Sequence, residues 1–538
     1  MPEFATAAPP PTWVDSEAEL VSGLDLLGLR NPVQNLGLEV LTGVTTISPT
    51  VRYISLHAWI ARRYAQARLP DSWKSFREFA GTVEAAVAIG NLIADRRTSG
   101  LVGFDGALLL LESNADPLEL KSLVKQLAVA IYAGPSNQLG VSFASESGVP
   151  GLTAERGIPL AEAVEEVLGR TDFAKTLLSN PSASGFQRSA LEELGAKFLI
   201  QKPTGKERRI LLNCVAPASP LPQELCRHAT YGLLLELSEN LKRPATERDL
   251  FALAISEQPG LPDYYQPWLD GWLRYLVRDV IAVAHEAALA AVVAELRAAS
   301  TKLGAVQVQT LLRNLLARDK ELQQPLRILG IVPKGKSPLD EPLRLVAQAV
   351  SSATNPRSAT YPPRWAGGFH EESVIQLALD GGVGSLAILP LTWLLARERA
   401  LKASKSGATY ASPLSTRSFW RIGVEEVILP GLQDMLRRGL TIREAAYELT
   451  LLTVEQHLSI AWARLAADPA KDVAVISADG DHWHYRKDFR AGRTAARLQQ
   501  GIGWLTQLAL IDDAGTTSEG SALLDSIRSV LRHETSTK

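Results

Sequence analysis

The amino-acid sequence predicts a mainly α-helical protein that is divided into several domains. Helix-favouring Ala, Leu and Arg recur along the 538 residues, aromatic residues make up only 6%, and strand-like alternation is rare. A chain of this length is too long for one hydrophobic core, so we expect a multidomain helical protein. The formal net charge of −2 excludes a protein that is basic overall, and any nucleic-acid binding must come from a local patch.

Clusters of Gly, Pro, Ser and Asn mark the predicted domain boundaries. We interpret ATNPRSATYPPRWAGG (353–368) as a linker and SKSGATYASPLSTRS (404–418) as a mobile loop. The sequence has no internal repeat of about 20 to 50 residues, which disfavours a solenoid. The predicted parts are a disordered lead (1–14), an N-terminal helical domain (15–177), a middle helical domain (178–353), a C-terminal helical region (354–470) and a small α+β domain (471–538).

Cysteine usage and hydropathy predict a cytoplasmic bacterial protein that does not contact a membrane. The two cysteines, Cys214 and Cys226, form neither a CxxC pair nor a disulfide framework. The start of the chain, MPEFATAAPPPTWV, lacks the charged and apolar regions of a signal peptide. The apolar stretch SLAILPLTWLLA (385–396) is too short to span a bilayer, and we expect it to form a buried helix.

Capping signals mark the start of two predicted helices. DPLELKSLVKQLAVAIY (116–132) places Asp116 at the N-cap and Pro117 at the first helical position. TIREAAYELTLLTVEQHLSIAWARL (441–465) begins with Thr441 and has a Glu three residues later, the pattern of a capping box.

Two further helical patterns carry Arg or His at positions of interest. VRYISLHAWIARRYAQAR (51–68) interleaves Arg with Tyr and Trp, and we interpret it as a core helix whose Arg side chains reach the surface. WLDGWLRYLVRDVIAVAHEAALAAVVAELRAAS (268–300) places Arg278 and His285 about two turns apart on one face of a helix.

Each of these stretches resembles a known group of proteins. The first, with YAGPSNQLGV and GLTAERG further along, resembles uncharacterised bacterial proteins from phage-defence and restriction loci, a resemblance that implies no mechanism. The spacing of Arg278 and His285 is similar to the R-x4–6-H motif of the HEPN ribonucleases. That resemblance implies acid/base chemistry by the His on a ribose 2′-hydroxyl, with the Arg supporting the phosphate.

A β-hairpin is predicted where DGDHWHYRK begins at residue 479. VAVIS (473–477) has the pattern of a strand, Asp-Gly favours a tight turn, and HWHYRK returns as a second strand. His482 and His484 share one face of that strand and could supply two metal ligands. The neighbouring Asp residues fit the turn, however, and no further ligand follows at metal-binding spacing, so we predict no metal and no cofactor.

The segment after the hairpin is the predicted nucleic-acid site. Residues 486–497 hold five basic residues against one acid, and a helix is expected from about 492 to 508. On a helical wheel two of the Arg side chains lie within about 60° of Arg490, and Arg suits bidentate phosphate binding. The candidate nucleic-acid-binding residues are Arg486, Lys487, Arg490, Arg493 and Arg497.

The last part of the chain resembles a winged-helix domain. An L-x-L-I run ends one helical pattern and T-x-x-G-x-x-L-L begins the next, over about the last 65 residues, while the long wing is absent or shortened. The resemblance implies DNA binding, so we predict a non-enzymatic recognition or scaffold subunit of a bacterial, anti-phage complex that contacts the phosphate backbone. Two alternatives stay open: a HEPN-like ribonuclease that uses Arg278 and His285, and a scaffold that binds only proteins.

Overall fold

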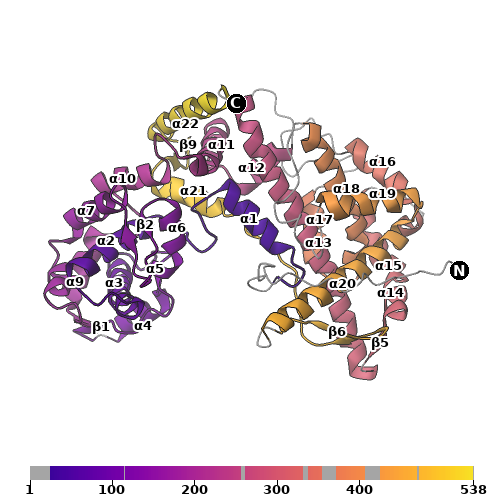
Figure 1. The fold of residues 1–538 in the computed structure, drawn as a ribbon, viewed down its shortest axis with the longest axis horizontal. Helices are drawn as coiled ribbons and strands as arrows, with labels where there is room; N and C mark the ends of the chain where they lie inside the picture. The colour runs from indigo at the N-terminus through magenta and orange to yellow at the C-terminus, as the bar shows by residue number, and fades with distance from the viewer. Residues whose placement is uncertain are drawn as a thin grey trace. The chain divides into compact units, whose positions relative to one another are not determined.

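The computed structural model places helices along most of the chain. The mainly helical class is confirmed: in the described part, 22 α-helices stand beside nine strands of two to four residues (Figure 1). The predicted lead, most of the predicted linker and most of the predicted mobile loop lie outside the described residues. The structure describes residues 25–113, 115–255, 261–303, 305–330, 337–353, 371–405, 424–468 and 472–536.

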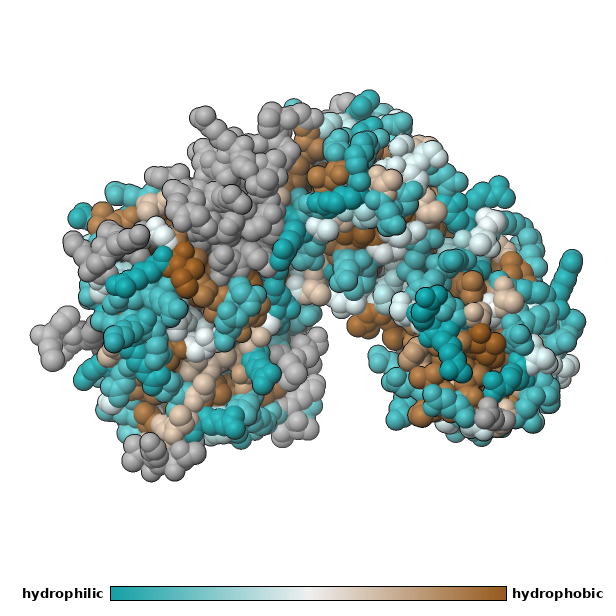
Figure 2. Space-filling model, turned by 180° about the vertical axis from the view of Figure 1, so that it is seen from behind, coloured by the Kyte–Doolittle hydropathy of each residue, from teal (hydrophilic) through white to brown (hydrophobic). Residues whose placement is uncertain are grey.

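No helix in those ranges combines the length and the apolar character that crossing a membrane requires. On the face drawn in Figure 2, hydrophilic residues are interspersed with hydrophobic ones. Large apolar side chains that reach the surface include Leu109, 69% exposed, and Trp462, 70% exposed. They come from helices far apart in the sequence, and single exposed apolar residues of this kind are ordinary on a protein surface.

The chain folds into two compact units, each built from separated stretches of sequence. The division falls within three helices: α1 (Arg30–Val40), α12 (Glu247–Ile255) and α13 (Gln266–Leu303). It also falls after Thr494, inside the region predicted as one α+β domain. The first unit takes the chain up to Leu36, Ala252–Gln258 and Leu273–Thr494; the second takes Gly37–Phe251, Pro259–Trp272 and Ala495–Lys538.

The first unit is a group of helices around α18 (Gly384–Lys405), which contacts α15, α16, α17, α19 and α20. The predicted buried helix is confirmed, because residues 385–396 of α18 are buried. The capping box is confirmed as well: the Thr441 hydroxyl accepts the Glu444 amide, and the Glu444 carboxylate accepts the Thr441 amide at 2.8 Å. The other helices are α14 (Val308–Leu316), α15 (Asp319–Ile328), α16 (Leu343–Ala353), α17 (Glu371–Leu379), α19 (Leu429–Arg437) and α20 (Ile442–Ala467).

A three-stranded antiparallel sheet completes the first unit. The predicted hairpin is confirmed as β6 (Ile476–Asp479) and β7 (His482–Tyr485), with Gly480 in the left-handed region at φ +57° in the turn. A two-residue strand, β5 (Val306–Gln307), pairs with the free edge of β7, so the strand order is β5-β7-β6. A strand of two residues has too little alternation to be recognised in a sequence.

The second unit consists of helices joined by short two-stranded ribbons. The ribbons pair β1 (Leu118–Glu119) with β4 (Gly185–Phe186), β2 (Ser142–Phe143) with β3 (Gly151–Leu152), and β8 (Ile511–Asp512) with β9 (Gly515–Thr516). The helices are α2 (Arg52–Gln66), α3 (Trp73–Ala94), α4 (Phe104–Glu112), α5 (Ala128–Ile131), α6 (Ala133–Gln138), α7 (Gly157–Leu168), α8 (Asp172–Ser179), α9 (Arg188–Lys197), α10 (Gly205–Val215), α11 (Leu225–Leu241), α21 (Leu498–Gln507) and α22 (Ser518–Ser536).

The helix predicted over residues 116–132 is wrong. Leu118 is fully buried and pairs with Phe186 in the β1–β4 ribbon, and helix appears only at α5. Asp116 does not begin a helix of its own, and its carboxylate instead accepts the Arg188 amide at the start of α9 at 2.9 Å. Tertiary pairing with a segment far along the chain therefore overrides a favourable local capping pattern.

Two of the three Arg side chains of α2, Arg52 and Arg63, do not reach the surface as we expected, while Arg62 does so in part, with 26% of its side chain exposed. Arg52 is 1% exposed and lies 2.6 Å from the buried carboxylate of Glu207, with its guanidinium over the Phe198 ring. Arg63 is also buried and forms an ion pair with Glu165 at 2.6 Å. The charges on α2 thus fix its position against other helices of the unit.

Two glycines allow α3 and α9 to pack with their backbones in contact. A Cβ on Gly195 would lie 1.9 Å from the carbonyl oxygen of Gly90, and a Cβ on Gly90 would lie 2.6 Å from the Leu191 oxygen. Any side chain at either position would force the two helices apart.

We therefore predict that Gly195→Ala destabilises the second unit by several kcal/mol, roughly the cost of overpacking a core. Gly134→Ala is the matched control, because nothing lies within 4 Å of a Cβ there. The control should be neutral or slightly stabilising, since Ala favours helix. Urea unfolding of both variants measures the difference, and equal midpoints would contradict the backbone contact.

Candidate functional site

The predicted basic segment is not part of a helix. Residues 486–496 follow β7 in an irregular conformation, and α21 begins only at Leu498, so the helix predicted from 492 is wrong over its first turns. Arg497, at its N-cap, has φ +63°, a left-handed conformation that a continuing helix does not permit. The helical-wheel stripe of Arg490, Arg493 and Arg497 therefore does not form.

Three of the five candidate residues lie on the surface, in the stretch that directly follows β7 in the sequence. Arg486 is 39% exposed in its side chain and pairs with the Asp472 carboxylate at 2.8 Å. Lys487 is exposed and donates to the Asp472 main-chain oxygen at 2.8 Å. Arg490 is exposed, and no ion pair is found for it among the described residues. These three residues are called the basic segment below.

The other two candidates have different surroundings. Arg493 is 25% exposed and donates to the fully buried carboxylate of Asp279 at 3.3 Å. The same carboxylate accepts the Thr494 amide at 2.9 Å. Burial raises the pKa of Asp279, and Arg493 offsets part of that effect by favouring the ionised form. Arg493 therefore balances a buried charge, and Arg497 begins α21 in the second unit.

A second carboxylate on α13 holds the same stretch of chain. Glu286 is 3% exposed and forms an ion pair with Arg30, which also donates to the main-chain oxygen of Gly492 and, at 3.1 Å, to the Thr494 hydroxyl. Burial raises the pKa of Glu286, and the Arg30 guanidinium works against that shift. Residues 492–494 are thus fixed by two carboxylates that lie about two turns apart on α13.

The two histidines of the hairpin are not part of a metal centre in the structure. The Asp481 carboxylate lies 2.7 Å from His482 Nδ1 and accepts the side-chain amide of Gln307 at 2.9 Å. Across the described ranges, no three His, Cys, Asp or Glu side chains are placed to hold a metal ion. The carboxylate instead ties the turn of the hairpin to the strand β5.

The HEPN-like pair lies on one helix, as predicted, but it is buried. His285 is fully buried: Trp393 Nε1 donates to its Nε2 at 3.0 Å, and its Nδ1 lies 2.6 Å from the Thr453 hydroxyl. An indole N–H can only donate, so Nε2 must be the acceptor and Nδ1 must carry the proton. Both nitrogens are occupied, and burial lowers the pKa of His285 to about 3. With Arg278 only 7% exposed, this geometry does not present the pair to an RNA substrate.

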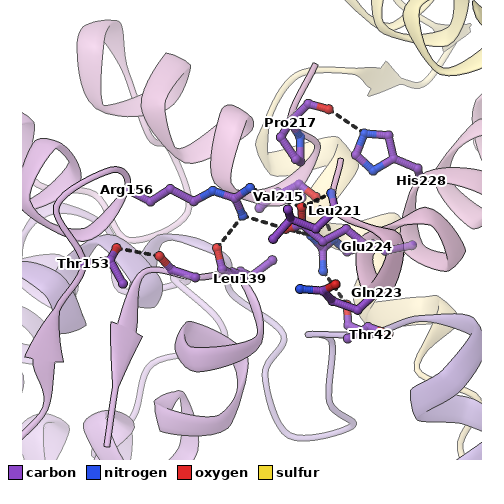
Figure 3. Close-up of polar contacts among 12 residues, drawn as sticks. Thr42, Leu139, Thr153, Arg156, Val215, Pro217, Leu221, Gln223, Glu224 and His228 are labelled. Atoms are coloured by element: carbon purple, nitrogen blue, oxygen red, sulfur yellow. Dashed lines mark hydrogen bonds and ion pairs between the residues drawn. The ribbon is translucent and has the colours of Figure 1, made fainter. Parts of the chain in front are cut away.

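The second unit contains a buried ionic network that the sequence did not reveal (Figure 3). The Glu224 carboxylate accepts from Arg156 at 2.6 Å and from Arg227 at 3.0 Å, and it also accepts the Leu221 amide. Burial opposes ionisation of Glu224, but these three donors hold its pKa below the usual value. Arg156 and Glu224 are 68 residues apart, so no local pattern in the sequence connects them.

Every charged group in this network has a structural partner. Arg227 is fully buried, and its remaining nitrogens donate to the main-chain oxygens of Val215 and Thr42 at 2.7 and 3.0 Å. His228 lies 2.7 Å from the Pro217 oxygen. Burial raises the pKa of the Cys214 thiol to about 12, so the thiol is not a nucleophile at neutral pH. The network joins α10, α11 and the loops beside them and offers no reactive group.

Comparison with known proteins assigns neither a family nor a fold relative. No family model matches the chain, and no curated protein or solved structure shows significant similarity to it. The function must therefore be inferred from the residues and their geometry.

We predict that Glu224→Ala destabilises the second unit by about 3 to 5 kcal/mol, because it leaves two guanidiniums without their shared counter-ion. The matched control is Glu166→Ala, which removes a carboxylate that is 58% exposed and pairs with Lys206. Loss of that surface pair should cost at most about 1 kcal/mol. Chemical denaturation measures both, and similar losses in the two variants would contradict the role of the buried network.

The buried His285 also predicts a dependence of stability on pH. Its pKa is about 3 in the folded protein, below the ordinary value of 6.5, so the unfolded chain binds the extra proton first as the pH falls. Stability from this group is complete above pH 6.5 and declines towards pH 3. Relative to His285→Gln, the wild type should lose about 1.4 kcal/mol per pH unit in that window. Unfolding free energies that run parallel for the two proteins would refute this.

Proposed function

We propose that the protein is a DNA-binding recognition or scaffold subunit that contacts the phosphate backbone through the basic segment. The observation that carries the proposal is the exposure of Arg486, Lys487 and Arg490 within five consecutive residues of a protein whose net charge is −2. Local positive charge on a nearly neutral protein directs an anionic polymer to one place on the surface. Arg493 and Arg497 are not part of this surface: Arg493 balances the buried charge of Asp279, and Arg497 is the N-cap of α21 in the second unit.

The contacts of the basic segment are weak enough to be exchanged for phosphate. Asp472, the partner of Arg486 and Lys487, is itself 30% exposed in its side chain. Exposed ion pairs contribute only about 0 to 1 kcal/mol, so a phosphate can replace the carboxylate at little cost. Arg490 needs no such exchange and can offer its planar fork directly.

The ribonuclease alternative has no such exposed residues to support it, since His285 is buried and both of its ring nitrogens are hydrogen-bonded. The remaining alternative, a scaffold that binds only proteins, makes a clear contrast with the proposal. A phosphate-binding protein releases counterions from DNA, and its affinity falls steeply with salt concentration. A protein-only scaffold shows no affinity for duplex DNA at any salt concentration.

The test is the affinity for a 30-base-pair duplex at about 50 and about 200 mM salt, where the slope of log affinity on log salt is about −0.9 per phosphate contacted. Replacing Arg486, Lys487 and Arg490 by Ala should make that slope less negative by about 2.7. The control replaces three surface cations of the second unit by Ala: Arg97, Lys175 and Lys206, which are 93%, 63% and 50% exposed. Equal weakening by both triple variants, or no binding by the wild type, would overturn the proposal.

A further inference from the structure

In the first unit, the helix pair α14–α15 is attached to the hairpin that precedes the basic segment. β5 runs directly into α14, and only Ala317 and Arg318 separate α14 from α15. The Val308 amide, at the start of α14, donates to the main-chain oxygen of Asp481 in the hairpin turn at 2.8 Å. The helix pair, the three-stranded sheet and the basic segment are therefore parts of one structural element.

The turn between the two helices is held by Arg443 of α20. Its guanidinium donates to the main-chain oxygen of Leu316, at the end of α14, and forms an ion pair with Asp319 at 2.6 Å, at the start of α15. Both helix ends at the turn are therefore fixed by one side chain. Such a clamp keeps the direction of α15 constant relative to α14.

One face of α15 is buried and the opposite face is open. Leu322, Pro325 and Leu326 are buried, and a Cβ on Gly384 at the start of α18 would lie 3.1 Å from Pro325. At 3.6 residues per turn, the exposed residues Lys320, Gln324 and Arg327 fall within about 60° of one another, on the side away from that core. No ion pair is found for Lys320 or Arg327 within the described ranges.

The residue types on this open face match the chemistry of DNA base edges. Arg and Lys bind the acceptors of guanine, Gln forms two hydrogen bonds with adenine, and an apolar side chain contacts the thymine methyl group. The apolar position is filled by Ile328, which is 58% exposed at the end of α15. An α-helix about 10 to 12 Å across fits the major groove, which is about 12 Å wide.

We propose that α15 enters the major groove of duplex DNA and reads base edges through Lys320, Gln324 and Arg327, while the basic segment contacts the neighbouring phosphates. This inference rests on the proposed DNA-binding function and assigns the sequence-reading part of the site to α15. α15 exposes two acidic side chains beside the open face: Glu321, 60% exposed and 3.9 Å from Arg318, and Asp319, which is 46% exposed but paired with Arg443. Glu321 is the less firmly held of the two. Glu321 opposes the approach of DNA, so Glu321→Gln should tighten binding to all duplexes.

The experiment starts with a pool of 30-base-pair duplexes with random central positions, from which the wild type selects its preferred sequence. Affinities for the selected and a scrambled duplex then give a discrimination ratio at one salt concentration. Gln324→Ala and Arg327→Ala should each lower that ratio about tenfold, because each removes a bidentate base contact. Arg327→Lys keeps the charge and should restore overall affinity but not the ratio. The triple Ala variant of the basic segment should weaken both duplexes equally and leave the ratio unchanged.

The outcomes separate the two proposals. If selection returns no preferred sequence, or if the α15 variants keep the wild-type ratio, the role of α15 is overturned while phosphate binding by the basic segment stands. If the α15 variants lose the ratio but the basic-segment variant behaves as the wild type, the assignment of the phosphate contacts fails and that of α15 stands. If the wild type binds no duplex, both are overturned. Unchanged unfolding midpoints confirm that the exposed substitutions leave the fold intact.

Discussion

The first unit depends on the need to compensate carboxylates that are buried on one helix. Asp279 and Glu286 lie two turns apart on α13, and both are almost fully enclosed. An unpaired buried charge costs several kcal/mol, so each carboxylate requires cationic or amide donors. Arg30 supplies them from the N-terminal side, and Arg493 with the Thr494 amide supplies them from the C-terminal side. Charge compensation thus joins three distant stretches of chain.

This constraint also decides which Arg residues remain available for a ligand. If Arg493 left Asp279, it would leave a fully buried carboxylate without its counter-ion. A phosphate would therefore have to compete with a buried carboxylate for the Arg493 guanidinium. Arg486 has an exposed partner, and exchange there costs little. Five basic residues that look equivalent in the sequence therefore differ in what holds them, and the difference follows from the burial of the carboxylate opposite.

Structural features whose interacting residues lie only a few positions apart could be predicted from the sequence. The capping box of Thr441 and the Asp-Gly turn before His482 depend only on local backbone geometry, and both are present. Failures occurred where the decisive partner lies far away in sequence. Residues 118–119 pair with β4 and do not form the expected helix. The helix expected from 492 is absent over its first turns because Arg493 binds Asp279, which lies 214 residues before it in the sequence. Periodicity shows which side chains share a face, but not whether that face is buried.

The pair Arg278 and His285 shows the same limit, and α15 shows the reverse case. Both stretches place polar residues on one side of a helix, but residues 275–289 of α13 are all buried, while α15 is covered on one side only. In α13, His285 is a neutral core residue whose two ring nitrogens are both hydrogen-bonded. In α15 Lys320, Gln324 and Arg327 stay open to solvent, and Arg443 fixes the helix that carries them. Rigid presentation of exposed polar groups is what recognition of a regular polymer requires.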